Sequence, residues 1–359
     1  MGYEMSIGSY KYLVKRRTIF LFSLLILLFI AVLVSLCIGI FVFDINTVLR
    51  ILLHPISRDK GLDPLQIRVL WNIRLPRIVM AIVAGMCFGI AGCILQCVLR
   101  NPLASPYTIG VASSASFGAA LAIILGAGIV YWHGEVIFYE NPYLIVLNAF
   151  IMSMMCSLLI MSLAYYKGAS PGTTILAGIA MTYLFTALTS LLQYFGTTEQ
   201  VAALVFWTFG DLGKAGWEDI IITTIVLVVL AIIVIYLSNN YNALLAGDEV
   251  AATLGVNVKL FRIVSLVIAS LLTATPVAFI GTIGFIGLLA PHIARLAIGP
   301  NHKFLVPASA LLGSLLLVVG DLISRIIVSP LILPIGVVTA FMGVPLFLYL
   351  LLTRREEYW

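Results

Sequence analysis

The chain has 359 residues, of which 62% are hydrophobic and 10% are charged, and its formal net charge at pH 7 is +5. Soluble domains carry about 25% charged residues, so this composition excludes a soluble enzyme or a nucleic-acid-binding domain. A spanning helix needs roughly 20 mostly apolar residues, and the length accommodates about ten such helices. We therefore expect an all-α integral membrane protein in contact with lipid.

Ten apolar runs, separated by polar residues, glycines and prolines, are predicted to span the membrane. The first run follows a basic stretch, as in a signal peptide, but it is too long for one and lacks a small-residue cleavage site. The eighth run is too short to cross comfortably. The predicted spans are Ile19–Phe43, Ile78–Val98, Thr108–Val130, Tyr143–Tyr166, Thr174–Phe195, Ile220–Leu237, Phe261–Ile280, Phe285–Ala297, Phe304–Val328 and Ile335–Leu352.

The distribution of basic residues predicts the orientation. With the amino terminus inside, twelve of the 20 lysines and arginines lie on the inner side, and such a bias marks the cytoplasmic side. We predict a cytoplasmic arm at residues 1–18, a single transmembrane domain at residues 19–352 and a cytoplasmic tail at residues 353–359. The longest inner loop covers about residues 239–260. The chain is then a multi-pass protein of the cell membrane with both termini in the cytoplasm.

The first outer loop is an exception to this bias, because it holds six basic residues. Either an acidic partner outside the cell or the lipid head groups would explain Arg50, Arg58 and Lys60. Arg74 and Arg77 lie on either side of a proline that fits the first turn of a helix. Both arginines are therefore predicted at the outer mouth of the second span.

Small side chains recur at every fourth position along the second span. Such a stripe lets membrane helices pack backbone to backbone. The five cysteines of the chain all lie in apolar runs and lack the spacing of a metal site, so we interpret them as packing residues. The stripe consists of Ala81, Gly85, Gly89, Cys93 and Cys97.

The stretch from Gly284 to Arg295 is too apolar for a loop and too rich in glycine and proline for an ordinary helix. Gly284 and Gly287 permit close packing, and Pro291 removes a backbone donor. His292 and Arg295 follow and add polarity. In lipid, such a broken segment is tolerated only where other helices or a water-filled cavity satisfy the freed backbone groups. We predict a short or re-entrant helix near the inner surface, with the histidine as a hydrogen-bonded structural group and not a metal ligand.

A faint internal repeat is also present. The tripeptide RIV begins two spans, at Arg77 and at Arg262. The number of residues between these two copies also separates Pro106 from Pro291. The two spans are predicted to run in opposite directions. Inverted repeats of this kind are typical of transporters.

The sequence contains neither a phosphate-binding loop nor a zinc-protease motif, since the patterns GxxxxGK[ST] and HExxH do not occur. We expect no enzyme activity and no cofactor or metal bound by this chain. Asp321 is the one carboxylate deep within a predicted span, and Arg325 follows it by one helical turn, in the favourable order for an ion pair. Because charges inside a membrane usually serve a function, proton coupling through Asp321 and a structural pair both remain open.

The long inner loop is predicted to contain a short helix, capped by Asp248 and ended by Gly255. Its apolar face suits docking to a protein partner in the cytoplasm. The alternative, a helix on the membrane surface, is less favoured because that face lacks large aromatic residues and has few cations. The residues assigned to docking are Asp248, Glu249, Val250, Ala251, Leu254 and Gly255.

Five ordered stretches resemble one family, the permease subunits of ABC importers for iron–siderophore complexes, haem and cobalamin. The resemblance covers nearly everything after the first predicted span and outer loop. The stretches are IRLPRIVMAIVAG at Ile73–Gly85, RNPLASPYTIGVASSASFGA at Arg100–Ala119, LAGDEVAATLGV at Leu245–Val256, GFIGLLAPHIARLAIGPNHKFLVPASALLG at Gly284–Gly313 and LPIGVVTAFMGVPLFLYLLL at Leu333–Leu352.

The resemblance implies a type II ABC importer permease fold with ten helices and inverted repeats. It implies a homodimer around the transport path, two cytoplasmic ATPase subunits that use ATP and Mg²⁺, and an extracytoplasmic substrate-binding protein. The family's coupling helix corresponds to Asp248–Gly255. The outer arginines that meet acidic residues of the binding protein correspond to Arg74, Arg77 and Arg325, and the cytoplasmic gate lies near Ser170, Pro171, Gly172 and Thr173.

On this resemblance we expect import of an iron(III)–siderophore complex, with cobalamin or haem as the alternative cargo of the same machine. Two other classes are weighed beside it. An ion-coupled secondary transporter would use Asp321. A permease for free divalent metal ions would need histidine or carboxylate ligands along its path, and the spans lack such clusters.

Overall fold

The computed structural model of the protein describes residues 7–39, 41–57, 61–126, 129–132, 135–138, 142–166 and 170–353. Arg58 and Lys60 of the basic outer loop lie outside the described residues, as do the first six residues of the predicted arm and residues 354–359 of the predicted tail. The described chain is helical apart from one two-stranded hairpin. This architecture confirms the prediction of an all-α membrane protein.

Seven of the described helices are long and apolar enough to cross a membrane. They and three further helices correspond one by one to the ten predicted spans. The first helix begins at Ile7, so that the described part of the predicted arm continues the first span as one helix. The ten helices are α1 (Ile7–Cys37), α4 (Leu75–Val98), α5 (Val111–Ile124), α6 (Pro142–Tyr166), α7 (Pro171–Phe195), α9 (Trp217–Tyr236), α12 (Val258–Ile280), α13 (Ile286–Ile298), α14 (His302–Ile326) and α15 (Ile335–Thr353).

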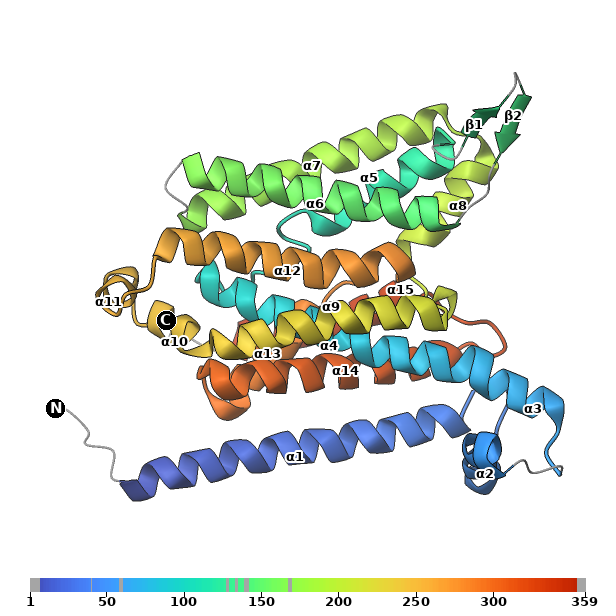
Figure 1. The fold of residues 1–359 in the computed structure, drawn as a ribbon, viewed down its shortest axis with the longest axis horizontal. Coiled ribbons are helices and arrows are strands. Elements are labelled where there is room, and N and C mark those ends of the chain that lie inside the picture. Colours follow the sequence, from blue (N-terminus) through green and yellow to red (C-terminus); the bar gives the residue numbers. More distant parts are fainter. Residues whose placement is uncertain are drawn as a thin grey trace.

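The long helices lie lengthwise in one bundle, and smaller elements gather at its two ends (Figure 1). We call the end with α2, α3, the hairpin and α8 the outer end, and the end with α10 and α11 the inner end, following the predicted orientation. Helix α1 begins at the inner end (Figure 1). The smaller elements are α2 (Ile45–Ser57), α3 (Pro64–Val69), a π-helical turn (Leu70–Arg74), β1 (Ile129–Trp132), β2 (Glu135–Phe138), α8 (Thr198–Thr208), a 3-10 turn (Leu212–Lys214), α10 (Ser238–Leu245) and α11 (Asp248–Thr253).

The third predicted span, Thr108–Val130, is wrong in its extent. The helix covers only Val111–Ile124, and Val130 lies in the hairpin, where it pairs with Ile137. Gly126 has a φ of 58° just after the helix, a left-handed conformation that ends helices. The β-branched and aromatic residues that follow favour a strand, although their apolar character resembled a continuing span.

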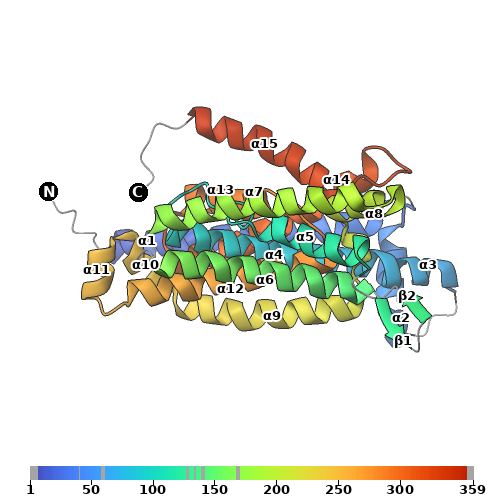
Figure 2. The same cartoon turned by 90° about the horizontal axis from the view of Figure 1, so that it is seen from above.

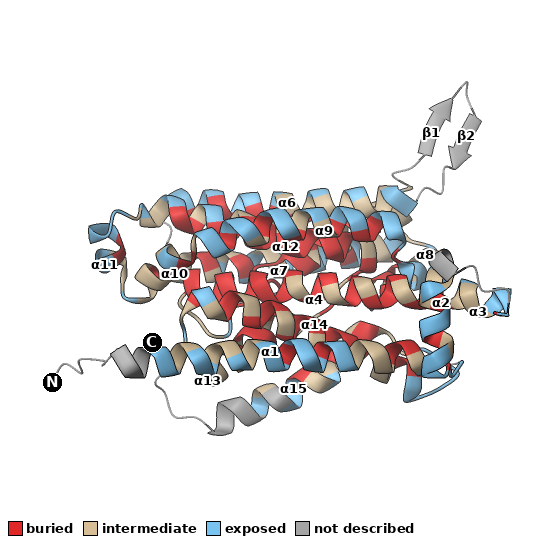
Figure 3. Ribbon diagram, turned by 60° about the horizontal axis from the view of Figure 1, so that its bottom comes forward, coloured by how far each residue is buried: buried red, intermediate tan, exposed pale blue. Residues whose placement is uncertain are grey.

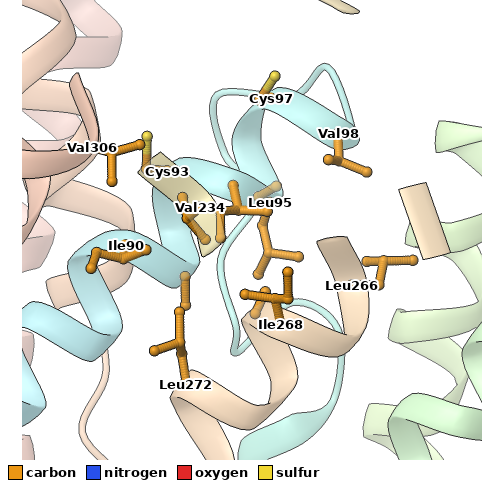
Figure 4. Packing of buried hydrophobic residues seen from close by; sticks show 14 of the residues in the cluster. Ile90, Cys93, Leu95, Cys97, Val98, Val234, Leu266, Ile268, Leu272 and Val306 are labelled. Carbon is orange, nitrogen blue, oxygen red and sulfur yellow. The ribbon is translucent and has the colours of Figure 1, made fainter. Parts of the chain in front are cut away.

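Helix α4 forms the centre of the bundle and is buried along most of its length (Figure 3). The stripe of small residues packs directly on the backbone of α14, and Gly92, a small residue of α4 outside the stripe, packs on the backbone of α13. A β-carbon added at Gly85 would lie 2.5 Å from the carbonyl oxygen of Gly313, and one at Gly92 would overlap the carbonyl oxygen of Gly287. Toward the inner end, larger α4 side chains such as Leu95 pack with Ile268 of α12 and Val234 of α9 (Figure 4). The predicted backbone-to-backbone packing is therefore confirmed.

The variant Gly92→Ala is expected to lower the free energy of unfolding by about 1–3 kcal/mol, because an overpacked site must shift backbone and not a flexible side chain. Thermal unfolding of the purified protein in detergent measures the loss. Gly172→Ala is the matched control, since a β-carbon there would meet no atom within 4 Å, and it should leave the unfolding temperature unchanged or slightly raised. Equal unfolding temperatures for the two variants would contradict the close contact.

The predicted broken segment begins in the turn between α12 and α13 and includes most of α13. Gly281 has a φ of 76° and Phe285 a φ of 67°, so the chain turns through two left-handed residues before α13 begins. Pro291 lies inside α13, whose 13 residues are too few to cross a bilayer of about 30 Å. The Phe285 ring occupies the space that a side chain at Gly343 of α15 would need. The short-helix prediction for this segment is confirmed.

The internal repeat has a counterpart in space. Helices α4 and α12 lie side by side and run in opposite directions (Figure 1). Arg77 lies near the outer end at the start of α4, and Arg262 lies near the inner end at the start of α12. Pro106 packs against Gly287, so the two proline-containing breaks meet inside the bundle. This arrangement is that of inverted repeats.

Candidate functional site

A groove of about 330 Å³ lies between α5 and α7 and is lined almost wholly by uncharged polar side chains. Three of its hydroxyls donate to carbonyl oxygens one turn back in α7, at 2.9 Å for Thr182, 2.7 Å for Thr186 and 2.7 Å for Thr189. Each threonine oxygen keeps lone pairs that can accept further hydrogen bonds. The lining residues are Tyr107, Ala112, Ser113, Ser116, Thr182, Thr186, Thr189, Ser190, Gln193 and Thr282.

A second cavity, of about 540 Å³, adjoins this groove and is mainly apolar. Tyr107 and Thr282 line both cavities. Phe285 of the broken segment and Phe341 of α15 line the apolar one. Helix α15 lies along the side of the bundle on which α13 and α7 also lie (Figure 2). The broken segment therefore borders a cavity, which explains how irregular backbone is accommodated at this depth.

The outer end of the bundle holds a buried cluster of charges. Asp321 is completely buried, and its carboxylate accepts from Arg77 Nε at 2.6 Å and pairs with Arg325 Nε at 3.0 Å. Arg77 also reaches Asp211, at 3.3 Å. The i,i+4 pair predicted for Asp321 and Arg325 is confirmed. Because a buried charge is stable only when it is paired and hydrogen-bonded, these four residues form one structural unit.

Two arginines of this region hold the chain that connects α1 to α2. Arg74 donates to the carbonyl oxygens of Leu36 at 2.6 Å and of Phe41, and its guanidinium lies 4.4 Å from the centre of the Phe43 ring. Arg325 donates to Ser35, with its Nη2 at 2.5 Å from the hydroxyl oxygen. The end of α1 leaves backbone carbonyls without helical partners, and these arginines supply donors for them.

The three arginines predicted for docking are thus turned inward. Arg74, Arg77 and Arg325 are 5%, 7% and 5% exposed. Arg74 and Arg77 lie at the outer end as predicted, but each of the three guanidinium groups finds carbonyl or carboxylate partners within the chain. Arg68 and Lys214, by contrast, are exposed at the outer end. A docking role for the three buried arginines stays a prediction.

At the inner end, one carboxylate joins three segments. Asp248 of α11 accepts from Arg100 Nη2 at 2.5 Å and from Arg262 Nη2 at 2.9 Å. Arg100 lies just after α4 with a φ of 45°, an uncommon backbone conformation for a residue other than glycine. Its side chain also donates to the carbonyl oxygen of Leu244, at 3.2 Å. Asp248 was predicted as the cap of α11, but the cap is Gly247, and the carboxylate instead binds these arginines.

The short helix predicted in this loop is confirmed as α11, and Gly255 ends it with a φ of 85°. Its predicted apolar face is divided in two. Ala251 is fully buried against the bundle, whereas Val250 and Leu254 are 42% and 67% exposed. Glu249 is also exposed. The prediction that Ala251 shares the docking face is wrong, because a one-residue step around the helix turns it inward.

The turn predicted as the cytoplasmic gate forms the start of α7. Ser170 caps that helix, accepting from the amide of Thr173 at 3.2 Å, and Pro171 occupies the first turn. Gly172 borders open space. Residues 167–169, which precede this turn, lie outside the described residues. The gate assignment stays a prediction, and the capping explains the sequence of the turn on local grounds alone.

Polar groups at the end of α13 are bound within the bundle. Arg295 donates to the Oε1 of Gln96 at 3.0 Å, and the Nε2 of Gln96 donates to the carbonyl oxygen of Leu288 at 3.1 Å. His292 is partly buried on the same short helix. Among the described residues, no group of three or more His, Cys, Asp and Glu side chains is placed to hold a metal ion.

Comparisons with known proteins cover almost the whole chain. The model of the FecCD transport family matches residues 27–353. A protein of Methanocaldococcus jannaschii described as an ABC transporter permease is 46% identical over 350 residues, which are 97% of this chain and 98% of that protein. The hemin transport system permease protein HmuU of Yersinia pestis is 33% identical over an alignment of 328 positions, and the match covers 86% of this chain and 95% of that protein.

A solved structure agrees with these relatives. The structure of a metal-chelate type ABC transporter in an inward-facing conformation has a TM-score of 0.79 with this chain at 31% sequence identity. The match covers 93% of this chain and 99% of that chain.

Proposed function

Because this chain belongs to the FecCD transport family, we propose that it is the membrane-spanning permease subunit of an ATP-driven ABC importer that carries a metal chelate inward. An iron(III)–siderophore complex is the first candidate cargo, and cobalamin or haem is the alternative. The hemin permease of Yersinia pestis, which is similar along 95% of its length, supports cargo of this class.

The observation that carries the choice of a chelate is the uncharged, hydroxyl-lined groove between α5 and α7. A bare divalent ion requires carboxylate, imidazole or thiolate ligands that replace its water shell. A chelate brings its own ligands and presents carbonyl, amide and hydroxyl groups. Neutral hydroxyls bind such groups weakly, and transport requires binding that is weak enough for release.

We propose that a second copy of the chain closes the transport path. Residues of α7 line the groove, and residues of α15 line the adjoining cavity. Tyr183 of α7 and Phe341 of α15 are 74% and 77% exposed there. Pairing of two such faces would enclose a transport path. The groove would supply hydroxyl groups to its lining and the adjoining cavity would supply aromatic side chains, in line with the predicted homodimer.

Energy would enter through partners, two ATPase subunits that hold ATP and Mg²⁺. The exposed Val250 and Leu254 supply the apolar contact of α11, and Asp248 connects that helix to the end of α4 through Arg100. Tyr107, a few residues beyond Arg100, lines both cavities. A movement of α11 would therefore be transmitted to the transport path through the ion pair of Asp248 with Arg100 and the short stretch of chain from Arg100 to Tyr107. A binding protein would deliver cargo at the outer end, where Arg68 and Lys214 are exposed.

The variant Thr186→Phe tests the groove. The ring should fill the groove and reduce uptake of the cargo by about tenfold, which equals about 1.4 kcal/mol, without changing the unfolding temperature. Labelled iron(III)–siderophore, cobalamin and haem are offered in turn to proteoliposomes that contain the permease, its ATPase and its binding protein.

Two further variants control this experiment. Leu184→Phe adds a ring on the same helix outside the groove lining and should leave uptake unchanged. Thr186→Val keeps the shape but removes the hydroxyl, so it separates blockage from loss of hydrogen bonding. Full uptake of every cargo by Thr186→Phe would overturn the assignment of the groove to the path.

A further inference from the structure

Helix α2, which the sequence did not predict, lies across the other helices at the outer end. In Figure 1 it is seen nearly along its axis while α1 lies lengthwise, and Figure 3 again shows it crosswise to α1. The spanning helices run through the membrane, so a helix crosswise to them at one end of the bundle lies in the plane of the membrane surface. Its 13 residues, Ile45–Ser57, leave it too short to span.

Apolar residues cover about half of the circumference of α2, and only part of them face the protein. Val48 and Ile51 are fully buried, in a cluster with Leu36, Leu70 and others. Leu52 is partly buried against the same cluster. Three other apolar residues, Ile45, Leu49 and Leu53, are 47%, 47% and 56% exposed and recur every fourth residue. Residues at this spacing share one helix face. One apolar face therefore lacks a partner within the described chain.

The polar residues occupy a separate face. Asn46 and Arg50 each follow an exposed apolar residue by one position, and both are exposed. At 3.6 residues per turn, they lie about 100° around the helix from Ile45 and Leu49. The helix thus presents one face to the protein, one apolar face outward and one polar face between them.

The surroundings of the exposed face identify what covers it. Phe41 and Val42, directly before α2, are strongly exposed and extend the exposed apolar surface of α1 up to α2. Trp71 donates from Nε1 to the carbonyl oxygen of Ile51 at 3.3 Å, and Trp217 donates to the carbonyl oxygen of Trp71 at 3.2 Å. Tryptophan gathers at the boundary between lipid and water.

We propose that α2 is an interfacial helix embedded in the outer leaflet, with Ile45, Leu49 and Leu53 toward the acyl chains and Arg50 at the level of the lipid phosphates. The three-faced pattern and the position beside tryptophans fit a helix lying in a membrane surface. This helix would anchor the α1–α2 connection that Arg74 and Arg325 hold from within. The proposal concerns membrane anchoring and does not depend on the identity of the cargo.

Spin labels on the full-length permease in lipid nanodiscs test this proposal. Labels are placed singly through Leu49→Cys, Leu53→Cys and the matched control Asn46→Cys, and unsubstituted protein gives the background from the five native cysteines. We expect the labels at positions 49 and 53 to be several-fold more accessible to oxygen, which dissolves in lipid, than to a water-soluble nickel chelate. The label at position 46 should show the reverse.

Two results would overturn the proposal. One is higher accessibility to the nickel chelate at positions 49 and 53, which would place the apolar stripe in water. The other is loss of accessibility to both reagents at these positions when the binding protein is added, which would show that a protein partner covers the stripe. The labelled variants must keep the unfolding temperature of the parent. A second series of the same variants carries Cys37→Ser, which removes one native cysteine that could also react with the label.

Discussion

Asp321→Asn is expected to lower the free energy of unfolding of the permease by about 3–5 kcal/mol, because removing one partner of a buried ion pair leaves the other charge uncompensated. Asp321 is fully buried between Arg77 and Arg325. Its replacement leaves two buried guanidinium groups that repel each other, while Arg77 keeps its contact with Asp211 at 3.3 Å. The loss is measured by thermal unfolding in detergent and by the amount of folded protein in the membrane.

The double variant Asp321→Asn with Arg325→Gln is the matched control for this effect. It removes one positive charge together with the negative one, so it should recover a substantial part of the lost stability. The folded fraction of each variant should still import cargo at the expense of ATP. A stable and abundant Asp321→Asn protein that has lost uptake would contradict the structural role and would favour ion coupling through this carboxylate.

A charged residue on the exposed face of α11 is expected to separate the permease from its ATPase. In the variant Val250→Asp with Leu254→Asp, two carboxylates replace the apolar side chains that α11 exposes. Loss of central apolar contacts in an interface commonly costs 2 kcal/mol or more, so the affinity of the ATPase should fall by at least about tenfold. Co-purification of the two subunits and ATP-dependent uptake measure the effect.

The control for this variant lies at the opposite end of the bundle. Leu65→Asp places one such carboxylate on α3, at another exposed leucine, and should leave co-purification of the ATPase unchanged. All variants should share the unfolding temperature of the parent, since the replaced side chains lie on the surface. Normal co-purification and normal uptake with both aspartates present would exclude α11 as the docking helix.

The elements that the sequence predicted well depend on local pattern. Apolar runs of spanning length became helices, and Gly255 ended α11 because its φ of 85° suits glycine. The stripe that includes Gly85 and Gly89 predicted close packing, because small side chains have few other uses at regular spacing within a membrane helix. None of these conclusions needs knowledge of distant contacts.

The directions of the charged side chains could not be predicted in this way. Arg77 and Asp321 are 244 positions apart, and the segment that Arg74 binds lies more than 30 positions before it. The local sequence around an arginine at a helix end does not show whether its side chain faces water or a buried carbonyl oxygen. The only available signal was Asp321 itself, since a carboxylate within a span requires a cationic partner.

The short elements at the outer end were missed for a different reason. The residues of α2 are apolar on half of their circumference and interrupted by Arg50, so they matched neither a span nor a loop. The hairpin follows α5 without a polar side chain between them in the sequence, and the left-handed Gly126 comes two residues after the end of α5. Length alone distinguishes such segments poorly, because a short apolar run fits a strand, a surface helix or part of a span.

Uptake by proteoliposomes tests the central claim most directly. The permease is reconstituted with its ATPase and binding protein, and entry of labelled iron(III)–siderophore is followed with and without ATP on the side of the ATPase, and with ionophores that abolish ion gradients. The account predicts uptake that requires ATP and is unaffected by the ionophores. Uptake that proceeds without ATP and stops when the proton or sodium gradient is dissipated would contradict it.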